Sequence, residues 1–98
     1  MAPTYDLLDQ ISRDWRRLTP LQKEQFKVAR DEMIADMRAG KGFRKSLRVK
    51  GVQGHPNVFE MTWAPDGRAT FSYGEEVLPG EPHIIWRRIG THTIFARP

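Results

Sequence analysis

The feature that most constrains the fold is a change in the spacing of apolar residues near position 41. Before this point, apolar side chains recur every three or four residues, which is the period of a helix with one buried face. After it, apolar and polar residues alternate, which is the period of a half-buried strand. The spacing therefore predicts two helices followed by a sheet, an α+β arrangement in a single domain of 98 residues.

Two helices are expected in residues 1–40. The first covers about residues 4–17, and its apolar positions share one face: Leu8, Ile11, Trp15 and Leu18. The second covers about residues 20–39, and its apolar face carries Phe26, Ala29, Met33 and Met37. Because the joint between them is short, we expect the two helices to pack as an antiparallel hairpin.

The second helix carries its own start and stop signals. Thr19 is a suitable N-cap, Pro20 suits the first helical position, and Gln22 completes a capping box with Thr19. Gly40 stands where a left-handed residue commonly ends a helix. These signals predict the limits of the second helix independently of its apolar spacing.

Residues 41–98 are expected to form the sheet. The alternating segments place strands at about residues 47–50, 59–63, 68–73 and 83–89. Between the second and third lies Pro65-Asp66-Gly67, which is typical of a type I turn followed by a left-handed glycine and a bulge. This loop predicts a register that pairs Ala64 with Arg68, Thr62 with Thr70, Glu60 with Ser72, Trp63 with Ala69, Met61 with Phe71 and Phe59 with Tyr73.

The predicted register sorts the strands into an apolar and a polar face. We expect the helical hairpin to cover the apolar face of a three- to four-stranded antiparallel sheet. The polar face then presents Glu60, Thr62, Arg68, Thr70 and Ser72. Whether Arg87 or Arg88 joins this face stays open, because the residues on both sides of that choice are apolar: Ile84 and Trp86, or Ile85 and Ile89.

Composition limits the classes of function. The net charge of +4 lies entirely in residues 41–98, since residues 1–40 carry seven basic and seven acidic side chains. Such asymmetry favours a polyanionic partner. The absence of cysteine excludes a disulfide framework, and three scattered histidines do not form a metal motif, so no metal or other cofactor is expected. With no long apolar run and no signal-peptide pattern, we expect a cytoplasmic protein that does not contact membranes.

A titratable side chain follows the last predicted strand. The chain there reads Arg87-Arg88-Ile89-Gly90-Thr91-His92, so an imidazole is placed beside two cations where an apolar run ends. A histidine near positive charge suits chemistry on phosphate groups. An idle histidine at a solvated strand end is the alternative that position alone leaves open.

The ending Gly90-Thr91-His92-Thr93-Ile94-Phe95 and the order of elements resemble the RelE/ParE superfamily of bacterial toxins. The ending is especially similar to the YafQ-like branch, and Arg68, which opens the strand after the central turn, is a second shared mark. The resemblance covers nearly the whole chain. It implies one RelE-like toxin domain over residues 1–98, with a helical hairpin on a four-stranded antiparallel sheet. For many members it also implies metal-independent cleavage of messenger RNA at the ribosomal A site, restrained by a cognate antitoxin.

The resemblance also implies roles for individual residues. His92 matches the family's acid/base histidine, and Arg68 matches its phosphate-binding arginine. Glu60, on the same predicted face as Arg68, is a candidate base, although an ion pair with Arg68 or Arg48 is an equally open role for it. The residues expected to bind RNA are Arg44, Lys45, Arg48, Lys50, Arg87, Arg88 and Phe95.

Two other functions remain open at this level. A ParE-type toxin would inhibit DNA gyrase without cleaving RNA, and an inactive module would keep the fold and bind a nucleic acid or a partner. Fold resemblance does not choose among these activities. The Gly-Thr-His ending favours the endoribonuclease, because a non-catalytic binder has no evident need for an imidazole near Arg68.

Overall fold

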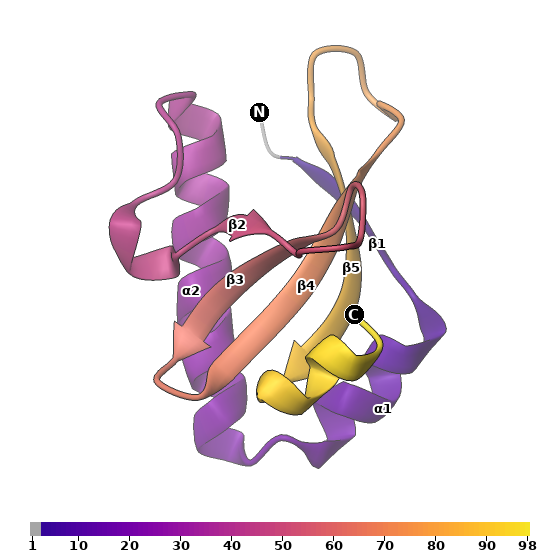
Figure 1. Ribbon diagram of the computed structural model, residues 1–98. Helices are drawn as coiled ribbons and strands as arrows, with labels where there is room; N and C mark the ends of the chain where they lie inside the picture. Colours follow the sequence, from indigo (N-terminus) through magenta and orange to yellow (C-terminus); the bar gives the residue numbers. More distant parts are fainter. Residues whose placement is uncertain (1–2) are drawn as a thin grey trace.

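The structure is a computed structural model that describes residues 3–98, so Met1 and Ala2 of the predicted domain lie outside the described residues (Figure 1). Its elements in chain order are β1 (Thr4–Leu7), α1 (Asp9–Arg17), α2 (Pro20–Ala39), the 3-10 helix η1 (Lys45–Leu47), β2 (Lys50–Gly51), β3 (Phe59–Ala64), β4 (Gly67–Gly74), β5 (His83–Gly90) and the 3-10 helix η2 (His92–Ala96). Within residues 3–98, no helix is long and apolar enough to cross a membrane.

The five strands form one mixed sheet in the order β1-β5-β4-β3-β2. Strand β1 runs parallel to β5, whereas the other neighbours are antiparallel. The prediction of an α+β fold is confirmed. The prediction of a three- to four-stranded antiparallel sheet is wrong, because an additional strand joins one edge in the parallel direction.

That additional strand, β1, occupies the part of the chain where the first helix was expected to begin. Thr4 lies opposite His83 and Leu7 opposite Trp86, so β5 supplies the backbone partners of this segment. The helix itself begins at Asp9. Local apolar spacing cannot reveal this strand, because its hydrogen-bond partners lie near the other end of the chain.

The signals read for the second helix are confirmed by α2. The Thr19 hydroxyl accepts a hydrogen bond from the Gln22 backbone N–H at 3.1 Å, and the Gln22 side chain accepts one from the Thr19 N–H at 2.8 Å. Gly40 ends the helix with φ of 69°. Both ends of α2 are thus fixed by residues that compensate for the missing backbone partners at a helix terminus.

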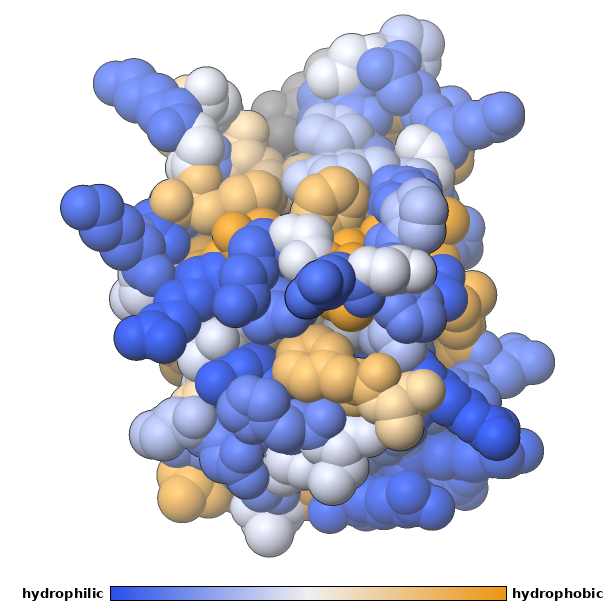
Figure 2. Space-filling model, in the orientation of Figure 1, coloured by the Kyte–Doolittle hydropathy of each residue, from blue (hydrophilic) through white to orange (hydrophobic). Residues whose placement is uncertain are grey.

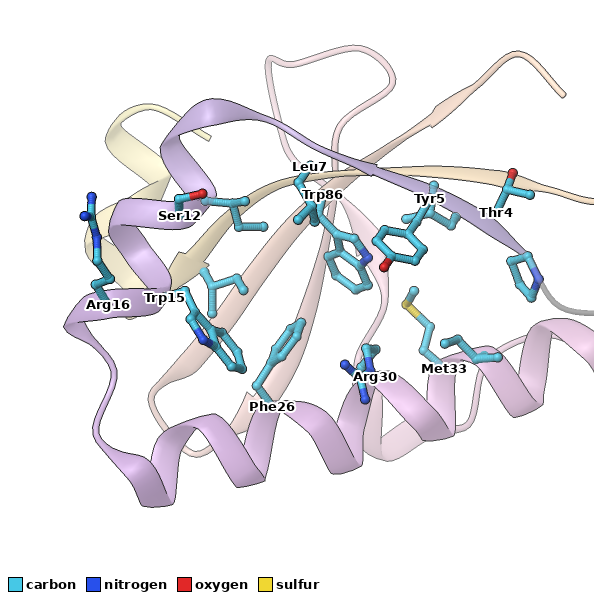
Figure 3. Close-up of a pocket in the computed structure, with 15 residues that line it drawn as sticks. Thr4, Tyr5, Leu7, Ser12, Trp15, Arg16, Phe26, Arg30, Met33 and Trp86 are labelled. Carbon is cyan, nitrogen blue, oxygen red and sulfur yellow. The ribbon is translucent and has the colours of Figure 1, made fainter. Parts of the chain in front are cut away.

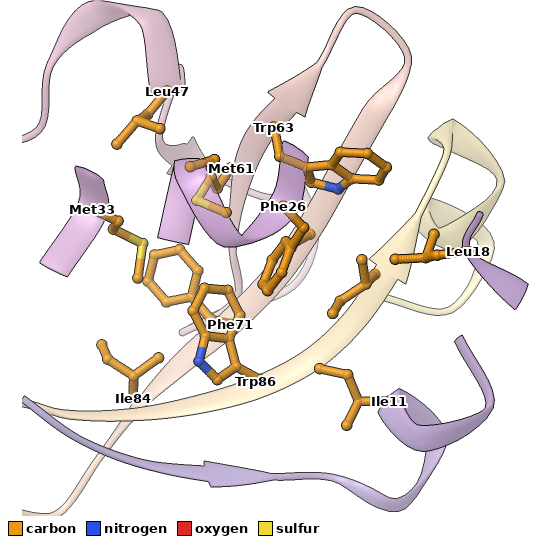
Figure 4. Close-up of a cluster of buried hydrophobic side chains, with 13 residues drawn as sticks. Ile11, Leu18, Phe26, Met33, Leu47, Met61, Trp63, Phe71, Ile84 and Trp86 are labelled. Atoms are coloured by element: carbon orange, nitrogen blue, oxygen red, sulfur yellow. The ribbon is translucent and has the colours of Figure 1, made fainter. Parts of the chain in front are cut away.

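The two helices pack on different parts of the sheet. Helix α1 contacts β5, whereas α2 contacts β3 (Figure 1). Phe26 of α2 lies between them at the centre of the core, where its ring meets Trp63 and Trp86 edge-on at centroid distances of 6.5 and 5.4 Å (Figure 4). Its ring also meets Trp15 of α1 edge-on at 5.9 Å. Such edge-to-face contacts add to the burial energy of the aromatic rings.

The predicted strand at residues 47–50 is mostly wrong. Residues 45–47 form η1 instead, and Leu47 is buried against the core. Arg48 has a left-handed backbone conformation, with φ of 48°, which interrupts an extended chain. Regular pairing therefore begins only at Lys50.

The faces of β3 and β4 are as predicted, but their register is displaced. Thr62 lies opposite Arg68, and Glu60 lies opposite Thr70, a displacement of two residues that leaves every side chain on its predicted face. Gly67 does not adopt the predicted left-handed conformation. The irregularity falls between Thr62 and Ala64 instead, at Trp63. The Trp63 ring lies where a side chain on Gly67 would be, since a Cβ atom there would meet the ring at 2.5 Å.

A second irregularity, on β5, resolves the open question about its arginines. The pairing with β4 shifts between Thr70, opposite Arg88, and Phe71, opposite Trp86, so that Arg87 is the extra residue of a bulge. The bulge changes the alternation of the strand. Trp86 before it and Ile89 after it can therefore both point into the core, although they are three residues apart.

Candidate active site at the turn between β3 and β4

His92 is the first residue of η2, directly after β5. Thr91 caps η2 by accepting a hydrogen bond from the Thr93 N–H at 3.4 Å. Gly90 allows η2 to fold back closely, since a Cβ atom on it would lie 2.8 Å from a side-chain carbon of Ile94. In the Gly-Thr-His sequence, the glycine therefore makes room for η2 and the threonine caps it, and the histidine presents an exposed imidazole.

The imidazole of His92 is held at the turn between β3 and β4. Its Nδ1 lies 3.2 Å from a carboxylate oxygen of Asp66. The Phe95 ring meets it edge-on with centroids 5.7 Å apart. The sequence reasoning missed Asp66, because it read this residue only as part of a turn, and no local pattern shows which side chain a turn carboxylate will contact.

Arg68 is anchored at the same turn. Its Nη1 donates to the carbonyl oxygens of Gly67 at 2.9 Å and of Ala64 and Pro65 at 3.3 Å each. Within residues 3–98, no protein acceptor is bonded to its Nε or Nη2, so three N–H donors remain for a ligand. Arg68 is half-buried and His92 exposed, so both are open to solvent beside one turn.

Glu60 lies on the same face but farther from the turn. It is opposite Thr70, whereas Arg68 is opposite Thr62, which places Glu60 about 7 Å beyond the Thr62–Arg68 pair along the strand. Its carboxylate lies 3.9 Å from Lys50 Nζ, so its ion-pair partner is Lys50 rather than Arg68 or Arg48. Glu60 and His92 therefore lie on opposite sides of Arg68 along the sheet.

The two arginines of β5 have different partners. Arg88 donates to the buried carboxylate of Asp14 on α1 through Nε at 2.7 Å and Nη2 at 3.2 Å. Arg87 points to the polar face, where its Nε donates to the Pro98 carbonyl at 3.1 Å. Asp14 pairs with Arg88, whereas Arg87 contacts Pro98 and, through Nη1, the Ser72 hydroxyl at 3.5 Å.

Arg44, the first of the residues predicted to bind RNA, is engaged with α2. Its guanidinium contacts Asp36 at 3.0 Å and Glu32 at 2.8 Å. Hydrogen bonds from the side chain and backbone of Arg44 hold the pKa of the Asp36 carboxyl below its usual value. Arg44 therefore fastens the segment after α2 to that helix. The other predicted cations of this segment are exposed: Lys45, Arg48 and Lys50.

Trp86 and the other two histidines, His83 and His55, lie away from the turn between β3 and β4. Trp86 is buried in the core. His83 is buried, and its ring nitrogens lie 2.9 Å from Asp6 and 2.7 Å from the Thr4 hydroxyl, which ties β1 to β5. His55 lies exposed in the loop before β3.

The molecule has two contrasting surfaces. Hydrophilic side chains dominate the face over which η2 and the last residues lie, around a small apolar patch (Figure 2). On the other side of the sheet, a groove of about 660 Å³ lies between α2 and the β1–α1 segment (Figure 3). The groove is mostly apolar, and its labelled lining includes Tyr5, Leu7, Trp15, Phe26, Met33 and Trp86.

No family model and no curated protein matches this sequence, but solved structures share its fold. A chain of the DinJ–YafQ toxin–antitoxin complex from E. coli superposes with a TM-score of 0.65 at 15% identity, over 95% of this chain and 96% of that one. This chain has the fold of the RelE and YafQ toxins. A chain of the RelB–RelE antitoxin–toxin complex from Methanococcus jannaschii gives a TM-score of 0.60 at 13% identity, covering 92% of this chain and 93% of that one. A copper-bound mutant toxin from Helicobacter pylori gives 0.64 at 17% identity, covering 93% and 96%.

Proposed function

We propose that this RelE-fold chain is the toxin of a type II toxin–antitoxin system. In this proposal it is an endoribonuclease that cleaves ribosome-bound messenger RNA without a metal ion and so inhibits translation. The observation that carries the proposal is that His92 of η2 and Arg68 of β4 both contact one exposed turn. The solved toxins with the same fold support the toxin role.

RNA cleavage by the neighbouring 2′-hydroxyl needs three contributions. A base removes the proton of the attacking hydroxyl, a cation stabilises the crowded phosphorane, and an acid protonates the departing 5′-oxygen. An imidazole exchanges protons near neutral pH, which makes His92 the acid. Asp66 is a positioning residue, because its contact with Nδ1 orients the ring and leaves Nε2 for the leaving group.

Arg68 stabilises the phosphorane in this scheme. The carbonyls that hold its Nη1 fix the guanidinium in place, so that the free Nε and Nη2 donors reach two phosphate oxygens without further reorganisation. Glu60 acts as the base from the other side of the phosphate. The position of Arg68 between Glu60 and His92 suits this division, because base and acid act on opposite bonds of the reacting phosphorus.

The partners follow from the charge distribution and from the related structures. Lys45, Arg48 and Lys50 form an exposed basic segment beside the polar face, which would bind the RNA backbone independently of its sequence. Phe95, whose ring meets the His92 imidazole edge-on, would stack on a base. Toxins with the same fold are seen in complexes with antitoxins, which supports a cognate antitoxin as the protein partner. A cytoplasmic location for both remains part of the proposal.

Cleavage of ribosome-bound message by purified protein tests the proposal. Removing a positioned general acid typically lowers the rate by about 10²–10⁴-fold, and we expect this range for His92→Ala. We expect a comparable loss for Arg68→Ala. His55→Ala is the matched control, because it removes an exposed loop imidazole away from the turn, and it should keep the wild-type rate.

Near wild-type cleavage by both His92→Ala and Arg68→Ala would refute this site. Expression in a bacterial host distinguishes the endoribonuclease from the other two functions that are compatible with this fold, a gyrase inhibitor and an inactive module. Arrest of translation with cuts in messenger RNA supports the endoribonuclease. DNA damage would indicate a gyrase inhibitor instead, and unaffected growth would indicate an inactive module.

A further inference from the structure

Strand β3 lacks a partner along part of its outer edge, the edge that β2 joins. The Val52 N–H donates to the Val58 carbonyl at 2.8 Å, so the backbone groups of Val58 face that edge. Backbone groups at alternate positions of an extended chain face the same way, and those of Glu60 and Thr62 therefore face the outer edge too. Strand β2 begins only at Lys50, opposite Glu60, and does not reach Thr62 (Figure 1).

The edge is free at Thr62. The register of β2 would place Arg48 opposite it, but Arg48 is left-handed, and its N–H donates to the Lys45 carbonyl at 3.1 Å. Apart from the ladder with β4, residues 3–98 supply no backbone partner to Thr62. One N–H and one C=O thus lie next to each other as a free donor and acceptor. Trp63, the next residue, has a buried Nε1 that is also without a partner in this part of the chain.

This edge borders a cavity of about 320 Å³ between α2, η1 and the end of β3. The volume lies within the range of about 300–1,000 Å³ that is usual for sites of small ligands. Most of the lining is apolar: Val28, Ala29, Leu47, Trp63, Ala64 and Pro65. Neutral polar residues complete it, namely Gln25, Ser46 and Thr62. An apolar cavity with a few polar groups at one side suits a flat, partly polar ligand.

The charges around the cavity favour a neutral ligand inside it. Among the described residues that line it, Glu32 alone is charged, and the Arg44 guanidinium lies 2.8 Å from its carboxylate. A phosphate would therefore meet no free cation within the cavity. The exposed cations Lys45 and Arg48 lie just outside, since they flank the two η1 residues of the lining. A nucleotide could place its base inside the cavity and its phosphate beside these cations.

We propose that this cavity is a nucleobase subsite, in which the free N–H and C=O of Thr62 bind the edge of one base of the RNA. The inference rests on the proposed function for the identity of its ligand. Each base carries a donor next to an acceptor on its Watson–Crick edge, and proteins bind the unstacked bases of single-stranded RNA through such edges. Pro65 of the lining adjoins Asp66, which contacts His92, so the bound base belongs to a nucleotide near the cleaved bond.

A peptide strand fits this edge less well than a base does. Strand addition gains its affinity from main-chain hydrogen bonds along an extended sheet edge. Here β2 already occupies the edge at Glu60, and the irregularity at Trp63 interrupts the alternation directly after Thr62. The edge therefore offers the two groups of one residue, which match a single base better than a strand.

The test follows the Thr62 backbone amide and the Trp63 indole N–H by NMR in the full chain. One probe is a trinucleotide whose 2′-oxygens are methylated to prevent cleavage, and the other is the same backbone without bases. We expect the trinucleotide to shift both signals. The abasic probe should shift only the amides of Lys45, Arg48 and Lys50, because it keeps the phosphates and removes the groups that enter the cavity.

A substitution on α2 tests the cavity itself. Val28 lines it and is 60% exposed, so Val28→Trp fills the space without disturbing the core. We expect this variant to bind the trinucleotide about tenfold more weakly, which corresponds to the loss of one or two hydrogen bonds. Leu21→Trp is the matched control, because Leu21 is 69% exposed on the same helix and does not line the cavity. It should bind like wild type.

Three results would overturn the inference: a Thr62 amide that the trinucleotide does not shift, an equal shift of this amide by the abasic probe, and equal affinities of Val28→Trp and Leu21→Trp. A capped hexapeptide of alternating valine and threonine is titrated as well. If it shifts the Thr62 amide at lower concentration than the trinucleotide, the edge binds a protein strand and the inference also fails. None of these readouts needs cleavage. A protein that cleaves message but fails here refutes the base subsite alone, and the reverse result refutes the nuclease alone.

Discussion

Replacing Asp14 by alanine should destabilise the protein far more than its place on a mostly exposed helix suggests. Asp14 is 5% exposed and accepts three hydrogen bonds: from Arg88 Nε at 2.7 Å, from Arg88 Nη2 at 3.2 Å and from the Ile89 N–H at 3.1 Å. The Ile89 N–H lies beyond the residues of β5 that β1 pairs. The Asp14 carboxylate therefore takes the place of a backbone carbonyl, because β1 is too short to offer one to the Ile89 N–H.

The magnitude follows from what the substitution leaves behind. Losing one partner of a buried ion pair costs about 3–5 kcal/mol. Arg88 is still 18% exposed and keeps its bond to the Arg97 carbonyl. We therefore expect about 3 kcal/mol for Asp14→Ala, at the lower end of that range. For a domain of this size, such a loss lowers the thermal midpoint by roughly 12–24 °C.

Thermal and urea unfolding followed by circular dichroism measure this effect. Asp31→Ala is the matched control, because Asp31 also pairs with an arginine but is 68% exposed, and its loss should cost no more than about 1 kcal/mol. The double substitution Asp14→Leu/Arg88→Met removes both charges and should recover most of the lost stability. A cost for Asp14→Ala equal to that of Asp31→Ala would refute the reasoning, as would a double variant less stable than Asp14→Ala.

Two further predictions concern other parts of the fold. Gly67→Ala should destabilise the protein by about 1–3 kcal/mol in urea unfolding, because a Cβ atom would meet the buried Trp63 ring at 2.5 Å; wild-type stability would contradict this contact. Asp36 should titrate below 3.8 in an NMR titration and return towards that value in Arg44→Met. Since the folded-state pKa of Asp36 is the lower one, its contribution to stability is present above 3.8 and is lost as the pH falls through the folded value; an unchanged Asp36 pKa in Arg44→Met would contradict this.

The elements that could be predicted are those whose causes are local. The capping box of α2 and its terminal Gly40 are set by residues within one turn of the helix. The two faces of β3 and β4 follow from alternation, which a shift of two residues does not disturb. The elements that could not be predicted depend on partners far away in the sequence. Segment β1 is a strand because β5 lies beside it, and the bulge at Arg87 occurs in the pairing of β5 with β4.

The candidate site divides in the same way. The sequence predicts the turn between β3 and β4, because proline and glycine mark it. It also predicts an exposed His92, because that residue follows the end of a strand. The contact of His92 with Asp66 and the position of Arg68 against the turn carbonyls were not, since both depend on side-chain directions in the folded state. Arg44, which was predicted to bind RNA, forms ion pairs with Glu32 and Asp36 of α2, and composition alone does not show which charges neutralise each other.

The pairing of β1 with β5 sets an order of events during synthesis. Thr4 and His83 are separated by 79 positions, so a nascent chain carries the first strand without a backbone partner for most of its translation. Helix α2 and the hairpin of β3 and β4 need only nearby residues and can form earlier. Closure of the sheet waits until β5 has left the ribosomal exit tunnel, and only then can the imidazole that follows β5 reach the turn it shares with the arginine.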